Sequence, residues 1–289
     1  MKRLFSIFLL ISFLVAGCGA SKPANIAATT LPVYEFTTRL CSGTDLTVSR
    51  LVTESLSCLH DYSLNVRQVK AAESADHIVI SGAGLEEFME DILREKSVID
   101  ASLGISILEC QHEHDHDHDH SHHHEVDSHI WLSPKNAILM AANICSGLTE
   151  AYPQYEDIFA ANLAVLTEEL TVLQIYGEEA LSALSTHDMV TFHDGFGYFA
   201  HAFGLHILEA VEEESGSEAS AQELKHLIGL VREHRLPGLF TEVNGSCSAA
   251  EVIARETGIK IYTLDMAMAG DSYFSAMYHN INTIQEAME

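Results

Sequence analysis

Basic residues are scarce in this sequence of 289 residues. Lys and Arg together number 15, against 42 Asp and Glu, and the formal net charge is −27. Proteins that bind nucleic acids or anionic membranes need a basic surface, so this balance argues against both kinds of partner and favours cations. Hydrophobic residues still make up 47% of the chain, which excludes a disordered acidic polymer and is enough for a sizeable core.

Long apolar runs are absent after the N-terminus, and the one at the N-terminus is short. Two basic residues precede an apolar run over residues 4–15, too short for a transmembrane helix and typical of a secretory signal peptide. The run ends in Leu-Val-Ala-Gly-Cys18, which resembles the lipobox of bacterial lipoproteins. We therefore expect a signal peptide over residues 1–17, a lipid on Cys18 that anchors an extracytoplasmic protein to the bacterial membrane, and a tether over residues 18–24. The alternative is an ordinary signal peptide with a chance cysteine.

The cysteines lack zinc-finger spacing. Without Cys18 five remain, an odd number in a compartment that permits disulfides, so pairing within one chain cannot be complete. Cys41 and Cys58 bracket one short segment, which favours a disulfide between them. The alternative is a set of free, mostly buried thiols, or a Cys58 thiolate near a metal.

Short β-prone runs alternate with helical runs in two separate parts of the chain. Such alternation predicts an α/β fold in which each part forms a parallel sheet with flanking helices. We expect an N-terminal lobe over residues 25–152 and a C-terminal lobe over residues 186–289. The strands are expected near residues 26–30, 46–53 and 77–81 in the first lobe, and near 189–192, 205–211, 238–243 and 259–264 in the second. A helix is expected over residues 85–94, after the turn marked by Gly82 and Gly84.

The segment between these parts has the pattern of one long helix. Leu163, Leu166, Leu170 and Leu173 recur at three- and four-residue steps, and no glycine interrupts them before Gly177. We predict a rigid connecting helix within residues 153–185 that joins the two lobes.

Eight of the 18 histidines fall in one window, where they alternate with Asp or Glu. This window, residues 112–124, cannot pack as a strand or a helix and is predicted to be a mobile loop. Imidazoles at this density bind Zn²⁺, so we expect a loop that collects ions weakly; the alternative is a solvated acidic loop that binds metal incidentally. Its histidines are His112, His114, His116, His118, His120, His122, His123 and His124.

Metal-binding side chains follow predicted strands in both halves of the chain. His60 and His129 come from the first half, and His193 and Asp265 from the second. Ligands of open α/β sheets bind beyond the carboxyl ends of the strands, so these residues are expected to meet across a cleft between the lobes. Three imidazoles and one carboxylate suit tetrahedral Zn²⁺ better than Mg²⁺, Ca²⁺ or Mn²⁺, which prefer oxygen ligands. A lone histidine at a strand end is nevertheless more often structural than a ligand.

Three runs of sequence resemble motifs of the metal-binding lipoproteins of zinc and manganese ABC importers. They are His60-Asp61-Tyr62, the run over residues 127–134 and the run over residues 192–199, and the later runs 216–220 and 263–265 fit the same order. The resemblance implies two α/β lobes joined by one long helix, a metal buried between them, and delivery to a membrane permease. It also implies that His60, His129 and His193 are ligands. A histidine at the third position resembles the zinc branch, because the manganese branch carries a carboxylate there.

The sequence also departs from this family pattern. Leu59 and Ser128 stand where the family often has proline, and Met266 replaces the usual proline after the last carboxylate. Asp265 is therefore one candidate for the fourth ligand, with Glu242 or a water as the alternatives. The remaining carboxylates beside the ligands either orient an imidazole or serve as solvated and capping groups; they are Asp61, Asp127 and Asp194.

These observations predict a monomeric, extracytoplasmic Zn²⁺-binding protein, not an enzyme, that serves an ABC permease. Three alternatives stay open: a manganese-binding paralogue, a surface adhesin of the same fold, and a secreted zinc hydrolase. A hydrolase would need an open zinc position and a general base, for which Glu242 is the candidate.

Overall fold

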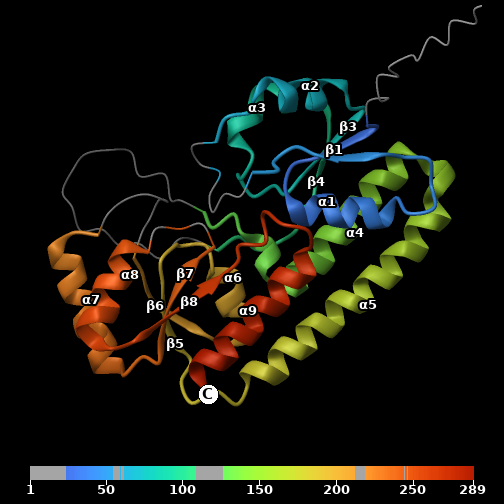
Figure 1. Cartoon of the computed structure of the whole chain (residues 1–289). Coiled ribbons are helices and arrows are strands. Elements are labelled where there is room, and N and C mark those ends of the chain that lie inside the picture. The colour runs from blue at the N-terminus through green and yellow to red at the C-terminus, as the bar shows by residue number, and fades with distance from the viewer. Residues whose placement is uncertain are drawn as a thin grey trace, which may run out of the picture.

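A computed structural model describes residues 24–54, 59, 62–108, 126–211, 219–243, 245 and 247–289. Figure 1 shows two α/β lobes, each built around a four-stranded sheet, with a long helix along one side. The predictions for Cys18, Cys58, His60, Asp61 and the His-rich window lie outside the described residues.

The first lobe contains a fully parallel sheet with the order β2-β1-β3-β4. Its helices cover both faces, so the central strands are apolar on both sides. Helices α1 and α4 belong to the main core, whereas α2 and α3 pack with a smaller cluster on the other face. The elements are β1 (Ile26–Ala28), α1 (Leu31–Leu40), β2 (Val48–Arg50), α2 (Val66–Ser74), β3 (His77–Ile80), the 3₁₀ helix η1 (Glu87–Met89), α3 (Glu90–Leu93), β4 (Ser97–Asp100), the 3₁₀ helix η2 (Ile130–Leu132) and α4 (Pro134–Ala151).

The second lobe repeats this strand order as β6-β5-β7-β8, again fully parallel. Helices α7 and α8 cover one face through an apolar cluster of their own, and α6 and α9 pack toward the main core. The predicted fold class, two lobes each with a parallel sheet, is confirmed. The elements are β5 (Asp188–Thr191), α6 (Gly197–Phe203), β6 (His206–Ala210), α7 (Ala221–His234), β7 (Gly238–Glu242), α8 (Ser248–Thr257), β8 (Lys260–Leu264) and α9 (Tyr273–Met288).

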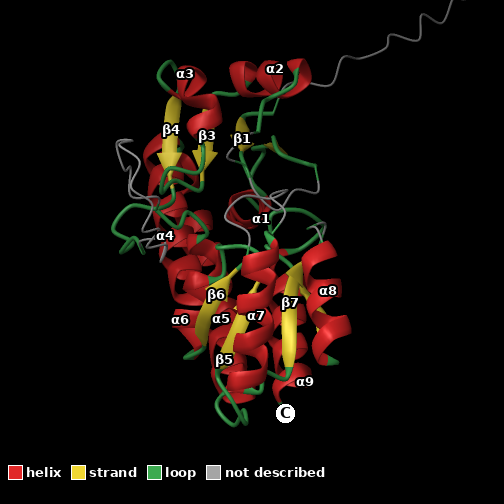
Figure 2. Ribbon diagram, turned by 90° about the vertical axis from the view of Figure 1, so that its left-hand side faces the viewer, coloured by secondary structure: helices red, strands yellow, loops and turns green. Residues whose placement is uncertain are grey.

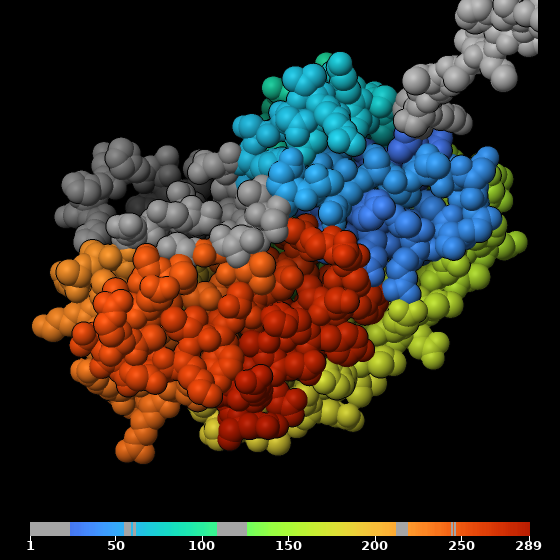
Figure 3. Space-filling model, viewed as in Figure 1, coloured from blue at the N-terminus to red at the C-terminus, as the bar shows by residue number. Residues whose placement is uncertain are grey.

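One long helix joins the lobes, as the leucine spacing predicts. After the short 3₁₀ helix η3 (Pro153–Tyr155), α5 runs over Glu156–Leu181 and contacts α4 and α1 of the first lobe and α9 of the second. Its fully buried side chains include Leu166, Leu170 and Leu173. In the space-filling view of Figure 3 the two lobes touch each other, and α5 lies along one side of both.

The strands of both sheets point toward the region between the lobes. Figure 2 shows β3 and β4 directed from the first lobe toward the second, while β7 is directed back toward the first. Parallel strands place their carboxyl ends at one edge of the sheet, so the loops of both lobes that can bind a ligand meet in this region.

The segment after β3 differs from the predicted helix over residues 85–94. Gly82, Ala83 and Gly84 all have positive φ angles, of 80°, 53° and 83°. The side chain of Glu86 accepts hydrogen bonds from the N–H groups of Ser81 and Gly82, at 2.7 and 3.0 Å. This turn occupies the start of the expected helix, which is reduced to η1 and the four residues of α3.

Three of the cysteines lie among the described residues. Cys41, at the end of α1, is buried and is a free cysteine among the described residues. Cys58 lies outside those residues, so the bridge between them stays a prediction. Burial raises the pKa of the Cys41 thiol to about 12, so it behaves as a small apolar side chain. Cys145 is also buried and free, whereas the free thiol of Cys247 is exposed.

Candidate metal site

His129 lies at the end of the first half of the chain, immediately before η2, and is only 2% exposed. Oδ1 of Asp127 lies 2.9 Å from both the backbone nitrogen and the Nδ1 atom of His129. A hydrogen on Nδ1 satisfies this carboxylate and leaves a lone pair on Nε2, which is the form that a metal requires. Asp127 therefore orients this imidazole.

His193 comes from the second lobe and is the second residue after β5. It is also 2% exposed, and its carbonyl oxygen accepts a hydrogen bond of 3.1 Å from the hydroxyl of Thr191. Its Nδ1 atom lies 3.5 Å from Oε1 of Glu242, the buried last residue of β7. The same reasoning assigns the hydrogen to Nδ1, so that Nε2 carries the lone pair.

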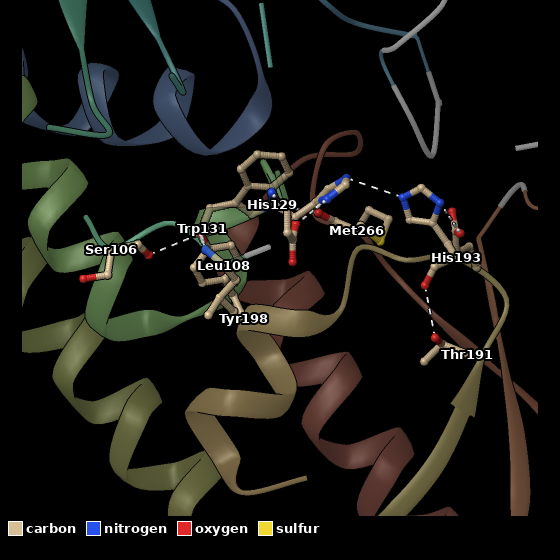
Figure 4. Close-up of polar contacts among 10 residues, drawn as sticks. Ser106, Leu108, His129, Trp131, Thr191, His193, Tyr198 and Met266 are labelled. Carbon is tan, nitrogen blue, oxygen red and sulfur yellow. Dashed lines mark hydrogen bonds and ion pairs between the residues drawn. The ribbon is translucent and has the colours of Figure 1, made fainter. Parts of the chain in front are cut away.

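The two imidazoles face each other across the boundary between the lobes (Figure 4). Their Nε2 atoms are 3.5 Å apart. Two nitrogens bound to one tetrahedral zinc ion, each at about 2.0–2.1 Å, are separated by about 3.3–3.4 Å. The spacing therefore suits two ligands of a single ion. The contact itself is a hydrogen bond whose donor depends on the ring tautomers.

Two glycines allow this close approach. A Cβ atom on Gly195 would lie 2.6 Å from Cδ2 of His193 and 2.9 Å from Cε1 of His129, and one on Gly197 would lie 2.7 Å from Oδ2 of Asp127. Neither glycine is predicted as a site residue by the sequence analysis. Their presence in the run that contains His193 was the available signal.

Asp265 follows β8 at the same edge of the second sheet and is half-buried. Its Oδ1 atom accepts a hydrogen bond of 2.8 Å from the N–H of Ala267. Among the described residues no three His, Cys, Asp or Glu side chains converge on one point, so Asp265 does not join the histidine pair there. His60 and Asp61 lie outside the described residues, and Asp194, next to His193, is half-buried.

Trp131, in the first lobe, contacts both His129 and residues of the second lobe. Its ring packs edge-on against His129, with centroids 5.3 Å apart, and its Nε1–H donates a 2.8 Å hydrogen bond to the carbonyl of Met266. The hydroxyl of Tyr273, on α9, donates to the carbonyl of Trp131 at 2.8 Å. These bonds fix the loop after β8 beside the two imidazoles.

Family comparison covers nearly all of the chain. The sequence profile of the ZnuA family, described as zinc-uptake complex component A, periplasmic, matches residues 26–287. The chain belongs to the ZnuA family. The resemblance found in the sequence motifs is thereby confirmed, and this family consists of transport components rather than enzymes.

Relatives of this ZnuA-family chain agree in fold. Zinc-binding lipoprotein AdcA of Streptococcus pneumoniae serotype 4 is 31% identical over an alignment of 297 positions, gaps included, which covers 96% of this chain and 59% of AdcA. The chain thus spans little more than half the length of the AdcA relatives that it matches, 56% or 59%. A crystal structure of ZnuA matches with a TM-score of 0.79 at 30% identity, over 92% of this chain and all of the other. The Zn(II)-bound ZnuA-like domain of S. pneumoniae AdcA matches with a TM-score of 0.76 at 26% identity, over 92% of this chain and 98% of that domain.

Proposed function

We propose that this ZnuA-family protein binds one Zn²⁺ ion between its lobes and delivers it to the membrane permease of an ABC importer. The observation that carries the proposal is the pair of buried imidazoles, His129 and His193, whose Nε2 atoms face each other at 3.5 Å. A carboxylate lies against the other ring nitrogen of each, which is the usual surrounding of a zinc-bound histidine.

The donor atoms favour zinc over manganese. Imidazole nitrogens suit Zn²⁺, whereas Mn²⁺ prefers sites made mostly of oxygen. The names of the AdcA relatives, and the Zn(II)-bound state of the ZnuA-like domain, support the same ion.

We assign His60 and Asp265 as the other two ligands, as the family motifs imply. In this assignment Asp127 and Glu242 orient the imidazoles of His129 and His193 and do not bind the ion themselves. A site with four protein ligands, of which His129 and His193 are each only 2% exposed, suits transport, whereas a zinc hydrolase needs an open position for water.

The loop over residues 112–124 is proposed to collect Zn²⁺ beside this site. The N–H of Asp127 donates a 3.0 Å hydrogen bond to the carbonyl of Leu108, so the two residues that flank the predicted loop lie together. The N–H of Leu108 in turn donates to the hydroxyl of Tyr198 at 2.9 Å, a contact from the second lobe (Figure 4). Ions released by the loop would thus be freed close to His129.

We further propose that a lipid on Cys18 anchors the protein outside the cytoplasm as a monomer. The lipobox-like run and the printed name of the lipoprotein relative support the anchor. In this arrangement residues 25–152 and 186–289 form the lobes, residues 153–185 connect them, and residues 18–24 tether them to the membrane.

Zinc titration against a chromophoric chelator tests this function. We expect one tight site in the parent protein and a loss of affinity of at least about a hundredfold in His193→Ala and in His60→Ala, because each removes a ligand. His226→Ala is the matched control, because it removes an exposed imidazole that is also paired with a carboxylate, Glu209, at 2.8 Å. Deletion of residues 112–124 is expected to remove only weak binding. Tight binding that survived both histidine changes but vanished with the loop would contradict the proposal.

A further inference from the structure

We propose that Asn280, a buried amide on α9, is a positioning residue that holds Asp265 in place as the fourth zinc ligand. The inference rests on the proposed function, in which Asp265 binds the ion. No sequence motif points to Asn280, because it lies in a helix that the sequence analysis does not predict.

The amide oxygen and the amide nitrogen of Asn280 both form hydrogen bonds with the backbone of one residue, Asp265. Its Oδ1 atom accepts a hydrogen bond from the N–H of Asp265, and its Nδ2 atom donates one to the carbonyl of Asp265, each at 2.7 Å. Asn280 is fully buried. One amide therefore restrains the backbone on both sides of the Asp265 Cα atom, and with it the point from which the carboxylate extends.

The Asp265 carboxylate is restrained in addition by the turn that follows. Its Oδ1 atom accepts from the N–H of Ala267, and Ala267 itself has a φ of 55°, a left-handed conformation that is unfavourable for alanine. The carbonyl of Met266, between them, accepts from Trp131. Such a turn persists only where its surroundings fix it. Because Oδ1 accepts the hydrogen bond from Ala267, Oδ2 is the carboxylate oxygen that we assign to the metal.

Helix α9, which carries Asn280, is itself held against the first lobe by contacts at its start. The N–H of Tyr273, at the start of α9, donates a 2.6 Å hydrogen bond to Oε2 of Glu35 on α1. The ring of Tyr273 packs edge-on against Phe36, with centroids 5.1 Å apart. The loop 265–272 is thus held by Asn280 at its beginning and by contacts with the first lobe at its end.

A double-mutant cycle separates positioning of the ligand from a general structural role. Zinc affinity is measured for the parent, Asn280→Ala, Asp265→Ala and the double variant, by competition with a chromophoric chelator. We expect Asn280→Ala to weaken zinc binding about ten- to hundredfold, as for other residues that orient a ligand. In the Asp265→Ala background the same change should alter affinity by less than about threefold, because the residue through which Asn280 acts is gone.

Matched variants keep the test independent of folding. Asn162→Ala removes an amide that also donates two hydrogen bonds to backbone carbonyls, those of Leu40 and Ser42. Neither residue belongs to the proposed site, so this change should leave zinc affinity unchanged. If Asn280→Ala does not fold, Asn280→Leu keeps a similar side-chain volume and removes both hydrogen bonds to Asp265. The Co²⁺-loaded proteins provide a second readout, because a change of ligand set alters the visible d–d absorption of the parent, and Asn280→Ala should reproduce part of the change caused by Asp265→Ala.

The Asp265→Ala variant tests the ligand set, and the Asn280→Ala variant tests the positioning role. If Asp265→Ala leaves zinc affinity and the Co²⁺ spectrum unchanged, Asp265 is not a ligand and the proposed ligand set fails. If Asp265→Ala weakens binding but folded Asn280→Ala does not, or if the two losses simply add in the double variant, the positioning role of Asn280 is wrong.

Discussion

At the scale of single residues, the site contains two imidazoles, those of His129 and His193. They can lie close together because Gly195 and Gly197 have no side chains that would occupy the space beside them. The sequence predicts His129 and His193 because they follow strands and stand in motifs that resemble those of the family, and it points to the carboxylates because they neighbour these histidines. It does not predict Gly195, Gly197 or Asn280, because their roles depend on distances between segments that are far apart in the chain. Those distances exist only once both lobes are packed.

Gly195→Ala is predicted to lower zinc affinity by about tenfold or more. The added methyl group would overlap both imidazole rings, at 2.6 and 2.9 Å, and the terminal methyl of Met266, at 2.6 Å. Met266 can yield because it is flexible, but the rings must move apart. Gly229→Ala is the matched control, since it lies in α7 with no atom within 4 Å of its Cβ position, and it should leave affinity unchanged. Equal zinc affinity in the two variants would refute this account of Gly195.

At the scale of secondary-structure elements, the turn between β3 and η1 contains a buried carboxylate. Glu86 is 4% exposed, and it accepts a 2.6 Å hydrogen bond from the hydroxyl of Thr29 as well as the two from Ser81 and Gly82. Burial raises its pKa from 4.5 to about 7, although these hydrogen bonds favour the charged form. The folded chain therefore holds a proton on Glu86 at pH values where the unfolded chain has released it.

The metal-free protein is predicted to lose stability as the pH rises from about 4.5 to about 7. Between these values the folded state binds the extra proton, so folding is favoured below the lower value and the advantage is gone above the upper one. The shift corresponds to about 3 kcal/mol of unfolding free energy. Glu86→Gln cannot titrate, and its denaturation midpoints should lack this decline, whereas the exposed variant Glu73→Gln should retain it. A decline of the same size in Glu86→Gln would show that another group is responsible.

Elements with a strong sequence pattern are the ones that the sequence predicts well. The leucine spacing of α5 and the apolar strands β3, β5 and β7 all reflect burial, which leaves a periodic signal. Helix α9 is not predicted, and the helix expected over residues 85–94 shrinks to α3. In the second case the contacts of Glu86 with the preceding turn outweigh the local helical pattern.

At the scale of the whole molecule, two lobes with the same strand order point their loops at each other. The sequence predicts this architecture because the α/β alternation occurs twice, on either side of one long helix. It does not predict how the lobes meet, through contacts such as the 2.8 Å hydrogen bond from Trp131 to Met266 and the 2.6 Å bond from Tyr273 to Glu35. The acidic excess fits a protein that handles cations, but the zinc assignment depends on the two facing histidines.

The most direct measurement is the anomalous difference density of a crystal grown with one equivalent of Zn²⁺, recorded at the zinc absorption edge. A single strong peak is expected between the lobes, at about 2.0–2.1 Å from Nε2 of both His129 and His193. A peak bound only by histidines of the window 112–124, with nothing between His129 and His193, would contradict the proposed site.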